Sequence, residues 1–374
     1  MLIIKYYYTI FEYIFLKKGY NNIKFFKNEI EQKIMLYTFC SIYNNFNNKH
    51  YRIDTYGKDI YNNCKDLVFP STNIPLNIVF LNKYTLIIYM LIHPIVILLI
   101  NIIQYFRRNI KFIESYKNML FVNNWFGYWR VNCNINFLYY LSTFDKDLKY
   151  EDKYLFIKKC MENHINISPL IDIDEVFIKH KYIEGGQSCF KFKNVLKGGN
   201  WIIQEKFENS EFVKNLLPNN APLSTIRIVS LSNNNNIDII SSVFRAGLNN
   251  SKTDHNSILF DICIDSGKLL YGKSNNNWYK NRKIQKNILF SKHPETNKTI
   301  EGNIIPEWKY IKNLIYDAHE KISPNVPIIG WDVALTDKGI FLLEANYSCS
   351  FFDADFDKSK YYKYINKSYK NNLI

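Results

Sequence analysis

The pattern of apolar and polar residues divides the chain at about residue 110. From residue 111 onward, short stretches alternate between apolar and polar side chains, and other stretches repeat apolar residues three and four positions apart. Alternation is typical of strands that bury one face, whereas the longer spacing is typical of amphipathic helices. The pattern predicts strands at 175–182, 188–195, 201–207, 225–232, 236–247, 258–265, 333–336 and 340–346, a short strand and turn at 165–171, and helices at 150–164, 212–218 and 307–322. Residues 111–374 are therefore expected to form a domain of the α+β class.

Residues 1–110 are more apolar and predict an N-terminal helical region. Its most apolar segment, at about 84–106, contains roughly 20 residues without a formal charge. That length is sufficient to span the hydrocarbon core of a bilayer, and Tyr84 and Tyr105 lie near its ends, as interfacial aromatic residues do. A buried helix of a globular domain is the alternative, because Pro94 lies at the centre of the segment. The sequence therefore predicts membrane association through this segment and leaves the buried helix open.

Composition and charge limit the classes of partner. The 374 residues are 47% hydrophobic, enough for a large core, and the formal net charge is +14. A basic chain favours an anionic partner, but the lysines are spread along the whole sequence instead of forming a basic face, so no nucleic-acid partner is expected. The seven cysteines include no CxxC pair and indicate neither a zinc site nor a disulfide framework. A reducing, cytoplasmic setting fits this usage best.

The stretch GWDVALTDKGIFLLEAN, at 330–346, combines acidic residues with an otherwise apolar run. It predicts two strands joined by a three-residue turn, DKG, with Gly in the last position. In that register Thr336 pairs with Ile340, and Asp332 then faces Glu344 directly, with Cβ atoms about 5 Å apart. Asn346 lies two residues beyond Glu344 and shares its face of the sheet. Three oxygen donors are therefore expected to converge on one face of the hairpin.

The other side chains of this hairpin favour a binding site on its acidic face over a face that is only exposed to solvent. Two carboxylates opposed at this distance repel unless a cation or a proton lies between them. Oxygen donors held by a rigid sheet suit Mg²⁺, which also binds phosphate oxygens. A hairpin whose polar face points only at water is the alternative, but such a face would carry more Lys and Thr. The opposite face is expected to hold Trp331, Val333, Leu343 and Ala345, and the acidic face to continue through Ala334 and Leu342. The hairpin predicts a magnesium site formed by Asp332, Glu344 and Asn346.

Two upstream stretches are candidates for nucleotide contacts. Lys179 ends a predicted strand, and Gly185 and Gly186 follow in a loop whose N–H groups can approach a phosphate. Most such glycine pairs only reverse the chain. About 20 residues later, Gln204 and Glu205 end the strand IIQEKF, where they are expected to meet the adenine and ribose. Either stretch alone is a weak indication.

Three further residues are candidates for a catalytic role. Arg227 and Arg245 each alternate with apolar neighbours on a predicted strand and so point to its polar face, where two arginines over a cleft would hold an anion. An ordinary exposed arginine is the alternative for each. His293 precedes Pro294 and is interpreted as an acid, a base or a substrate contact, with a structural turn as the alternative.

The order of these blocks resembles that of the ATP-grasp enzymes, in particular the sugar-transfer-associated ATP-grasp family. The resemblance extends from Lys153 to Asn346, roughly half of the chain, and its last block and TIRIVS are the most specific. It differs from the family pattern at His180, around Asp254 and in the stretch 293–297, on the side expected to take the substrate. The blocks are EDKYLFIKK, FIKHKYIEGG, IIQEKF, TIRIVS, FRAG, HPETNKTIEGNIIPEW and GWDVALTDKGIFLLEAN.

The resemblance implies an ATP-grasp fold, in which two α+β subdomains grip ATP and Mg²⁺. It implies an enzyme that phosphorylates a carboxylate and transfers the acyl group to an amine or hydroxyl acceptor. It also implies a role in cell-surface polysaccharide or glycan biosynthesis. Because the reaction needs ATP, the domain is expected in the cytoplasm, at the face of a membrane if segment 84–106 inserts. Two alternatives stay open, a kinase on the same fold and a membrane-tethered ATP-binding module without activity. The implied contacts are Lys153 and Lys179 to the phosphates, Gln204 and Glu205 to adenine and ribose, Asp332, Glu344 and Asn346 to Mg²⁺, and Arg227 and Arg245 to the transferred phosphoryl group or the carboxylate.

Overall fold

The structure is a computed structural model that describes five stretches of the chain, mostly in its C-terminal part. These stretches are 152–179, 189–233, 236–254, 257–274 and 289–347, with isolated positions at 8, 99, 103, 106, 107 and 364. The predicted helical region 1–110 and its segment 84–106 therefore lie outside the described residues, apart from those isolated positions, and the glycines 185 and 186 lie outside them entirely. Within the described stretches, no helix is long and apolar enough to cross a membrane.

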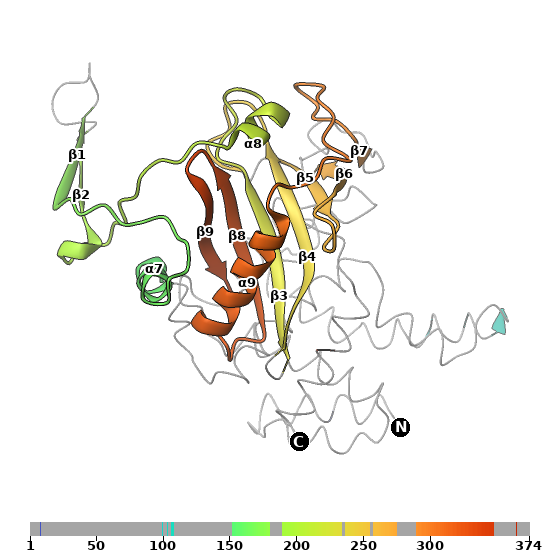
Figure 1. Cartoon of the computed structure of the whole chain (residues 1–374), viewed down its shortest axis with the longest axis horizontal. Coiled ribbons are helices and arrows are strands. Elements are labelled where there is room, and N and C mark those ends of the chain that lie inside the picture. Colours follow the sequence, from blue (N-terminus) through green and yellow to red (C-terminus); the bar gives the residue numbers. More distant parts are fainter. Residues whose placement is uncertain are drawn as a thin grey trace.

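A seven-stranded antiparallel sheet forms the centre of the described domain (Figure 1). The strand order across it is β7-β6-β5-β4-β3-β8-β9, so the C-terminal hairpin β8–β9 lies beside β3 at one edge. Strands and helices mix in this part of the chain, which agrees with the predicted α+β class. The strands are β3 (Thr225–Asn233), β4 (Asn236–Gly247), β5 (Ser257–Ile262), β6 (Leu269–Ser274), β7 (Leu289–Phe290), β8 (Ile328–Thr336) and β9 (Gly339–Asn346).

The long helix α9 (Trp308–Ile322) covers one face of this sheet (Figure 1). Its buried residues recur three and four positions apart, as the sequence predicted, and Ile311, Ile315 and Ala318 are fully buried. They pack with the inward side chains of the sheet, and Trp331 on β8 is among the largest of these. The main apolar core therefore lies between α9 and the sheet, and the opposite face carries charged side chains beside a small separate cluster of Val243 and Leu259.

A chain of hydrogen bonds crosses this core. The indole Nε1 of Trp331 donates to Ser230 Oγ at 2.7 Å, and Ser230 Oγ lies 2.7 Å from His319 Nδ1. The other ring nitrogen, Nε2, lies 2.8 Å from the carbonyl of Val326. Since a carbonyl only accepts, Nε2 carries the proton and Nδ1 accepts from the serine hydroxyl. Burial lowers the pKa of His319 to about 4, so the ring is neutral in the folded protein.

The turn of the β8–β9 hairpin differs from the prediction. Thr336 pairs with Gly339, so the loop contains two residues, Asp337 and Lys338, and not three. The Thr336 hydroxyl accepts from the Lys338 N–H at 3.1 Å and donates to the Gly339 carbonyl at 2.8 Å, which closes the shorter loop. Gly339 has a φ of 125°, a conformation that side chains with a Cβ rarely adopt.

A β-bulge restores the predicted pairing of the acidic residues. The register shifts between Asp332 and Val333, so Leu343 is the extra residue and Asp332 still faces Glu344. The predicted faces of the two leucines were wrong as a result. Leu342 pairs with Val333 and is fully buried in the core, whereas Leu343 lines the polar side of the sheet.

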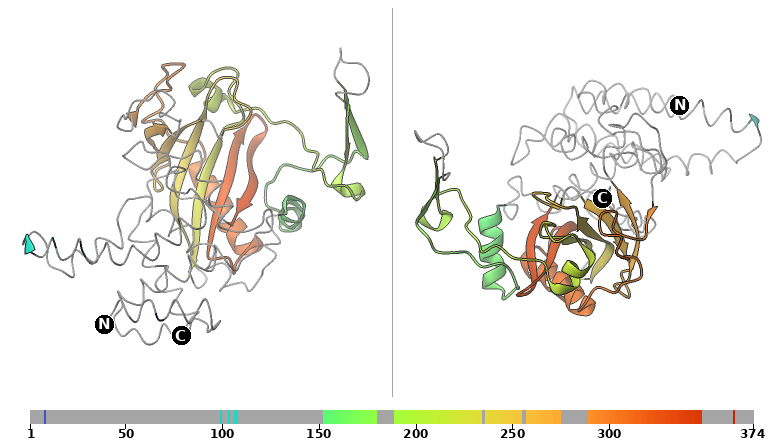
Figure 2. Two further views of the ribbon diagram at one scale, coloured as in Figure 1. Left: turned by 180° about the vertical axis from the view of Figure 1, so that it is seen from behind. Right: turned by 90° about the horizontal axis from the view of Figure 1, so that it is seen from above.

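A smaller unit stands apart from the large sheet. It is a two-stranded antiparallel sheet of β1 (Glu175–Lys179) and β2 (Cys189–Lys193), and both views show it separated from the main body (Figure 2). The helix α7 (Lys153–Glu162) lies between the two and contributes Phe156 to the core. Asp152 caps α7, because its carboxylate accepts from the N–H groups of the helix's first turn.

The segments that connect these units are less regular than predicted. The predicted strands 165–171 and 201–207 form only isolated bridges, which join Ile167 to Leu342, Leu170 to Gln204, and Trp201 to Asn194. The two segments lie beside the edge strand β9, but they lack the repeated backbone hydrogen bonds that define a regular strand. The remaining elements are η4 (Val195–Lys197) and α8 (Glu211–Leu216).

Candidate functional site

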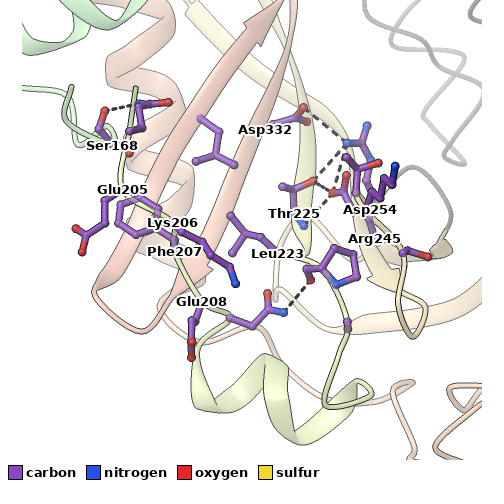
Figure 3. A pocket seen from close by; sticks show the side chains of 18 of the residues that line it. Ser168, Glu205, Lys206, Phe207, Glu208, Leu223, Thr225, Arg245, Asp254 and Asp332 are labelled. Carbon is purple, nitrogen blue, oxygen red and sulfur yellow. Dashed lines mark hydrogen bonds and ion pairs between the residues drawn. The ribbon is translucent and has the colours of Figure 1, made fainter. Parts of the chain in front are cut away.

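An open cleft with a volume of about 860 Å³ lies on the face of the sheet opposite α9 (Figure 3). Asp332 alternates with the core residues Trp331 and Val333 along β8 and therefore points to this face. The volume falls within the range of about 300–1,000 Å³ that is usual for small-molecule sites. Thr225, Arg245, Asp332, Leu343 and Glu344 contribute to the floor, and residues 204–209, 218–223 and 251–254 form the walls.

Arg227 and Asp332 form the central ion pair of the site. Arg227 on β3 faces Asp332 on β8, and its Nε and Nη2 donate to the two carboxylate oxygens at 2.5 and 2.9 Å. Arg245 Nη1 lies 3.7 Å from the same carboxylate. Burial alone would raise the pKa of Asp332, but the charges of Arg227 and Arg245 and the hydrogen bond from Arg227 outweigh it and lower that pKa. Asp332 is therefore ionised.

Arg245 is held from its other side by Asp254 and Thr225. Its Nη1 lies 3.7 Å from Asp254 Oδ2 and donates to Thr225 Oγ1 at 3.3 Å. The Thr225 hydroxyl makes a short hydrogen bond to Asp254, and the Thr225 N–H donates to the same oxygen at 3.2 Å. All three side chains are buried. Thr225 was not predicted as a site residue, and Asp254 was noted only within a stretch that differs from the family pattern, although both lie beside the ends of predicted strands.

The three predicted magnesium ligands lie together. Glu344 faces Asp332 across the hairpin, and Asn346 Nδ2 donates to Glu344 Oε1 at 3.2 Å. Lys153, the first residue of α7, lies 3.0 Å from Glu344 Oε2. In the part of the chain that the structure describes, no three His, Cys, Asp or Glu residues form a group that could hold a metal ion. Two carboxylates and an amide still fit Mg²⁺, because this ion usually binds one or two carboxylates and completes its shell with phosphates and water.

The predicted base-binding residues also line the cleft. Gln204 Nε2 donates to the carbonyl of Ser168 at 2.7 Å, and Glu205 makes an ion pair with Lys338 of the hairpin turn. Of Lys179 only the backbone is described, at the end of β1 opposite Cys189. The contact that was predicted for its side chain therefore stays a prediction, as do the contacts of the glycine loop that follows.

The structure does not bring His293 together with the other candidates. Its ring is fully buried and is absent from the lining of the cleft. Nε2 lies 3.2 Å from the carbonyl of Gly247, and Nδ1 accepts from the Glu295 N–H at 3.3 Å. Burial lowers the pKa of His293, so both nitrogens serve these hydrogen bonds in a neutral ring. The placement is that of the structural turn, the alternative left open by the sequence.

Residues 192–354, less than half of the chain, match a known family model, which is described as sugar-transfer associated ATP-grasp. The resemblance that the sequence motifs suggested is confirmed over these residues, which include the segment 201–207, the strands β3 and β4, and the β8–β9 hairpin. The first two blocks of the motif series precede the matched region.

A solved structure and the curated proteins add little to this match. D-alanyl-alanine synthetase A from Vibrio cholerae is similar at 11% identity with a TM-score of 0.32, over 61% of this chain and 66% of that one. This likeness is too low to support an argument about the reaction. No curated protein matches the chain.

Proposed function

We propose that this chain is an ATP- and Mg²⁺-dependent carboxylate ligase. It would activate an acid as an acyl phosphate and transfer the acyl group to an amine or hydroxyl acceptor. The observation that carries the proposal is the row formed by Glu344, Asp332 and Arg227 on three neighbouring strands, of which Glu344 and Asp332 line the cleft and Arg227 holds Asp332. The ATP-grasp match of residues 192–354 supports it.

In this proposal Asp332, Glu344 and Asn346 hold Mg²⁺. When bound, the ion would neutralise charge on the ATP phosphates and orient them for transfer. The carboxylates are already fixed before any ligand binds, because Arg227 holds Asp332 and Lys153 pairs with Glu344. Little rearrangement of side chains is then needed, which suits a reaction that depends on positioning.

The cationic residues have separate roles in the proposal. Lys153 and Lys179 bind phosphate oxygens of ATP, and Arg227 and Arg245 hold the transferred phosphoryl group or the substrate carboxylate. Arg245 suits this role because the contacts with Asp254 and Thr225 fix its guanidinium at the floor of the cleft. Fixed cations stabilise developing negative charge without solvent reorganisation, and phosphoryl transfer requires no nucleophile from the protein.

Gln204 and Glu205 bind the adenine and ribose in this proposal.

The family description suggests the biological setting of the reaction. We infer that the acid or the acceptor is linked to a sugar, in cell-surface polysaccharide or glycan biosynthesis. The reaction would take place in the cytoplasm, at the membrane face if segment 84–106 inserts. No nucleic acid takes part.

Thermal unfolding and product analysis test the proposed function. The melting temperature of the full chain is measured with and without Mg-ATP, and ADP and phosphate are then measured with candidate acids and amines. A ligase releases both ADP and phosphate only when acid and acceptor are present. A kinase releases ADP and keeps the phosphoryl group on its product. If Mg-ATP leaves the melting temperature unchanged, the protein is not an ATP-dependent enzyme.

A further inference from the structure

Lys153 contacts one of the carboxylates assigned to Mg²⁺ from a different element of the fold. It is the first residue of α7, and its Nζ lies 3.0 Å from Glu344 Oε2 on β9. Both residues line the cleft, and their side chains are 67% and 31% exposed. A ligand in the cleft can therefore reach both groups, and Glu344 already has a cation beside it.

The backbone of Lys153 is fixed, whereas its side chain is free to turn. Asp152 caps α7 at this end, and the buried ring of Phe156 lies 6.5 Å from that of Trp331, the neighbour of Asp332 on β8. The helix is thus attached to the strand that carries the other carboxylate. Because the lysine side chain is flexible and mostly exposed, it can change partner without any movement of α7.

The remaining oxygens of the two carboxylates have partners that are held more firmly. Both oxygens of Asp332 accept from Arg227, whose side chain is only 11% exposed, and Glu344 Oε1 accepts from Asn346 Nδ2 at 3.2 Å. A buried arginine with a bidentate contact is not expected to leave its carboxylate. Among the cations paired with these two carboxylates, Lys153 is therefore the one suited to exchange.

The charges of the ion-pair network at the metal hairpin cancel (Figure 3). The network contains three cationic and three anionic side chains, so its formal net charge is zero. Mg²⁺ alone would enter a neutral network and compete with an ammonium for Glu344, and ATP alone would bring its phosphates towards two carboxylates. When both bind, the ammonium released from Glu344 can pair with the phosphates. The members of the network are Lys153, Arg227, Arg245, Asp254, Asp332 and Glu344.

We propose that Lys153 pairs with Glu344 until Mg-ATP binds and then exchanges this carboxylate for the ATP phosphates. The exchange couples the two ligands, so each binds more tightly when the other is present, and by the same factor. The inference rests on the proposed function, which requires Mg²⁺ at Glu344 and ATP in the cleft. It goes beyond that function, because a lysine that only bound phosphate would have no effect on metal binding without nucleotide.

Lys214 provides a matched control. It lines the same cleft, and its Nζ lies 2.9 Å from Glu208 Oε2, in a pair whose side chains are 41% and 61% exposed. Glu208 is not assigned to the metal. Lys153→Met and Lys214→Met each remove one cation from an exposed pair in the cleft, so a general effect of charge is common to both and an effect of exchange is confined to Lys153.

The test measures metal binding and nucleotide binding separately in the full chain. The metal probe is Mn²⁺, which suits the same oxygen ligands as Mg²⁺ and whose free concentration is measured by electron paramagnetic resonance. Without nucleotide, Lys153→Met should bind Mn²⁺ about two- to fivefold more tightly than the wild type, the range expected when a competing exposed ion pair is removed. In EDTA, the same variant should bind AMP-PNP, a non-hydrolysable ATP analogue, more weakly. The factor by which AMP-PNP tightens Mn²⁺ binding should therefore fall. Lys153→Arg, which keeps the charge, and Lys214→Met should both bind free Mn²⁺ as the wild type does.

The outcomes separate this inference from the proposed function. If the wild type binds Mn²⁺ and AMP-PNP together but Lys153→Met binds free Mn²⁺ no more tightly, the inference is overturned and the proposed function stands. An equal gain in Lys214→Met would also overturn it. If the wild type does not bind AMP-PNP, or if Glu344→Gln binds Mn²⁺ as well as the wild type, the proposed function fails and the inference fails with it. Lys153→Gln, which also removes the charge, gives the same comparison if Lys153→Met folds poorly.

Discussion

Arg227 and Asp332 face each other on neighbouring strands, and the guanidinium binds both oxygens of the carboxylate, at 2.5 and 2.9 Å. The two side chains are only 11% and 8% exposed. Burial of a carboxylate to this degree costs free energy unless a cation lies beside it. The bidentate contact with the guanidinium favours the ionised form of the carboxylate and also fixes its orientation. Asp332 therefore presents its carboxylate to Glu344 and the cleft in a single arrangement.

Replacement of this arginine should destabilise the protein strongly. In Arg227→Met, Asp332 keeps only the more distant Arg245, so the free energy of unfolding at pH 7 should fall by roughly 3 kcal/mol. The folded-state pKa of Asp332 is lowered, so its stabilisation is present at neutral pH and is lost as the pH falls through that pKa. Urea unfolding at pH 7 and pH 3 measures both quantities. The double variant Arg227→Met/Asp332→Asn should be more stable than Arg227→Met alone, and a less stable double variant would contradict this account.

Glu344→Gln should abolish turnover with little loss of stability. The substitution removes one of the two carboxylates assigned to Mg²⁺, so kcat should fall by at least ~100-fold. The pair that Glu344 forms with Lys153 is partly exposed and is worth at most about 1 kcal/mol. ADP release at increasing Mg²⁺ and thermal unfolding check the two effects. Asp317→Asn, which breaks a comparable pair with Lys321 on α9, is the control and should keep full activity. Full activity in Glu344→Gln would show that the metal assignment is wrong.

The hairpin illustrates how far the sequence alone predicts this site. The pairing of Asp332 with Glu344 was predicted correctly from a turn one residue too long, because the bulge at Leu343 adds the residue that the real turn lacks. Alternation identifies which residues share a face at the ends of a hairpin, where acidic and apolar side chains differ clearly. It does not locate an extra residue between two leucines, either of which fits the core.

Other parts of the site could not be predicted because no local pattern encodes them. Thr225 and Asp254 are 29 residues apart, and only the folding of β4 back onto β3 brings the loop of Asp254 to Thr225. His293 was proposed as catalytic on its motif, but a motif does not distinguish a ring that faces a substrate from one that holds a turn.

His319 should make stability decrease in mild acid. Its pKa is about 4 in the folded protein and near 6.5 when unfolded, so between these values the unfolded state binds more protons. Stability therefore rises with pH through this window, and the contribution of His319 is lost as the pH falls from about 6.5 to about 4, up to about 3 kcal/mol. Urea unfolding between pH 4 and pH 7 should give a shallower pH dependence in His319→Gln. The exposed His164, replaced by Asn, should leave the slope unchanged, and an unchanged slope in His319→Gln would contradict the prediction.

Asp254 and Thr225 should act as a unit in holding Arg245. The carboxylate of Asp254 accepts from both the hydroxyl and the N–H of Thr225, and the same hydroxyl accepts from Arg245. Asp254→Asn removes the charge from this network and should lower the free energy of unfolding by about 2 kcal/mol, the usual value of a hydrogen bond to a charged group. Thr225→Val should destabilise less, because the backbone N–H of residue 225 still donates to Asp254.

A double-mutant cycle tests whether the two residues act together. Their coupling free energy should be about 1 kcal/mol, whereas the effects of independent sites are additive to within about 0.5 kcal/mol. Additive effects would show that Asp254 holds Arg245 without the hydroxyl, and the position of Arg245 would then depend on the ion pairs alone.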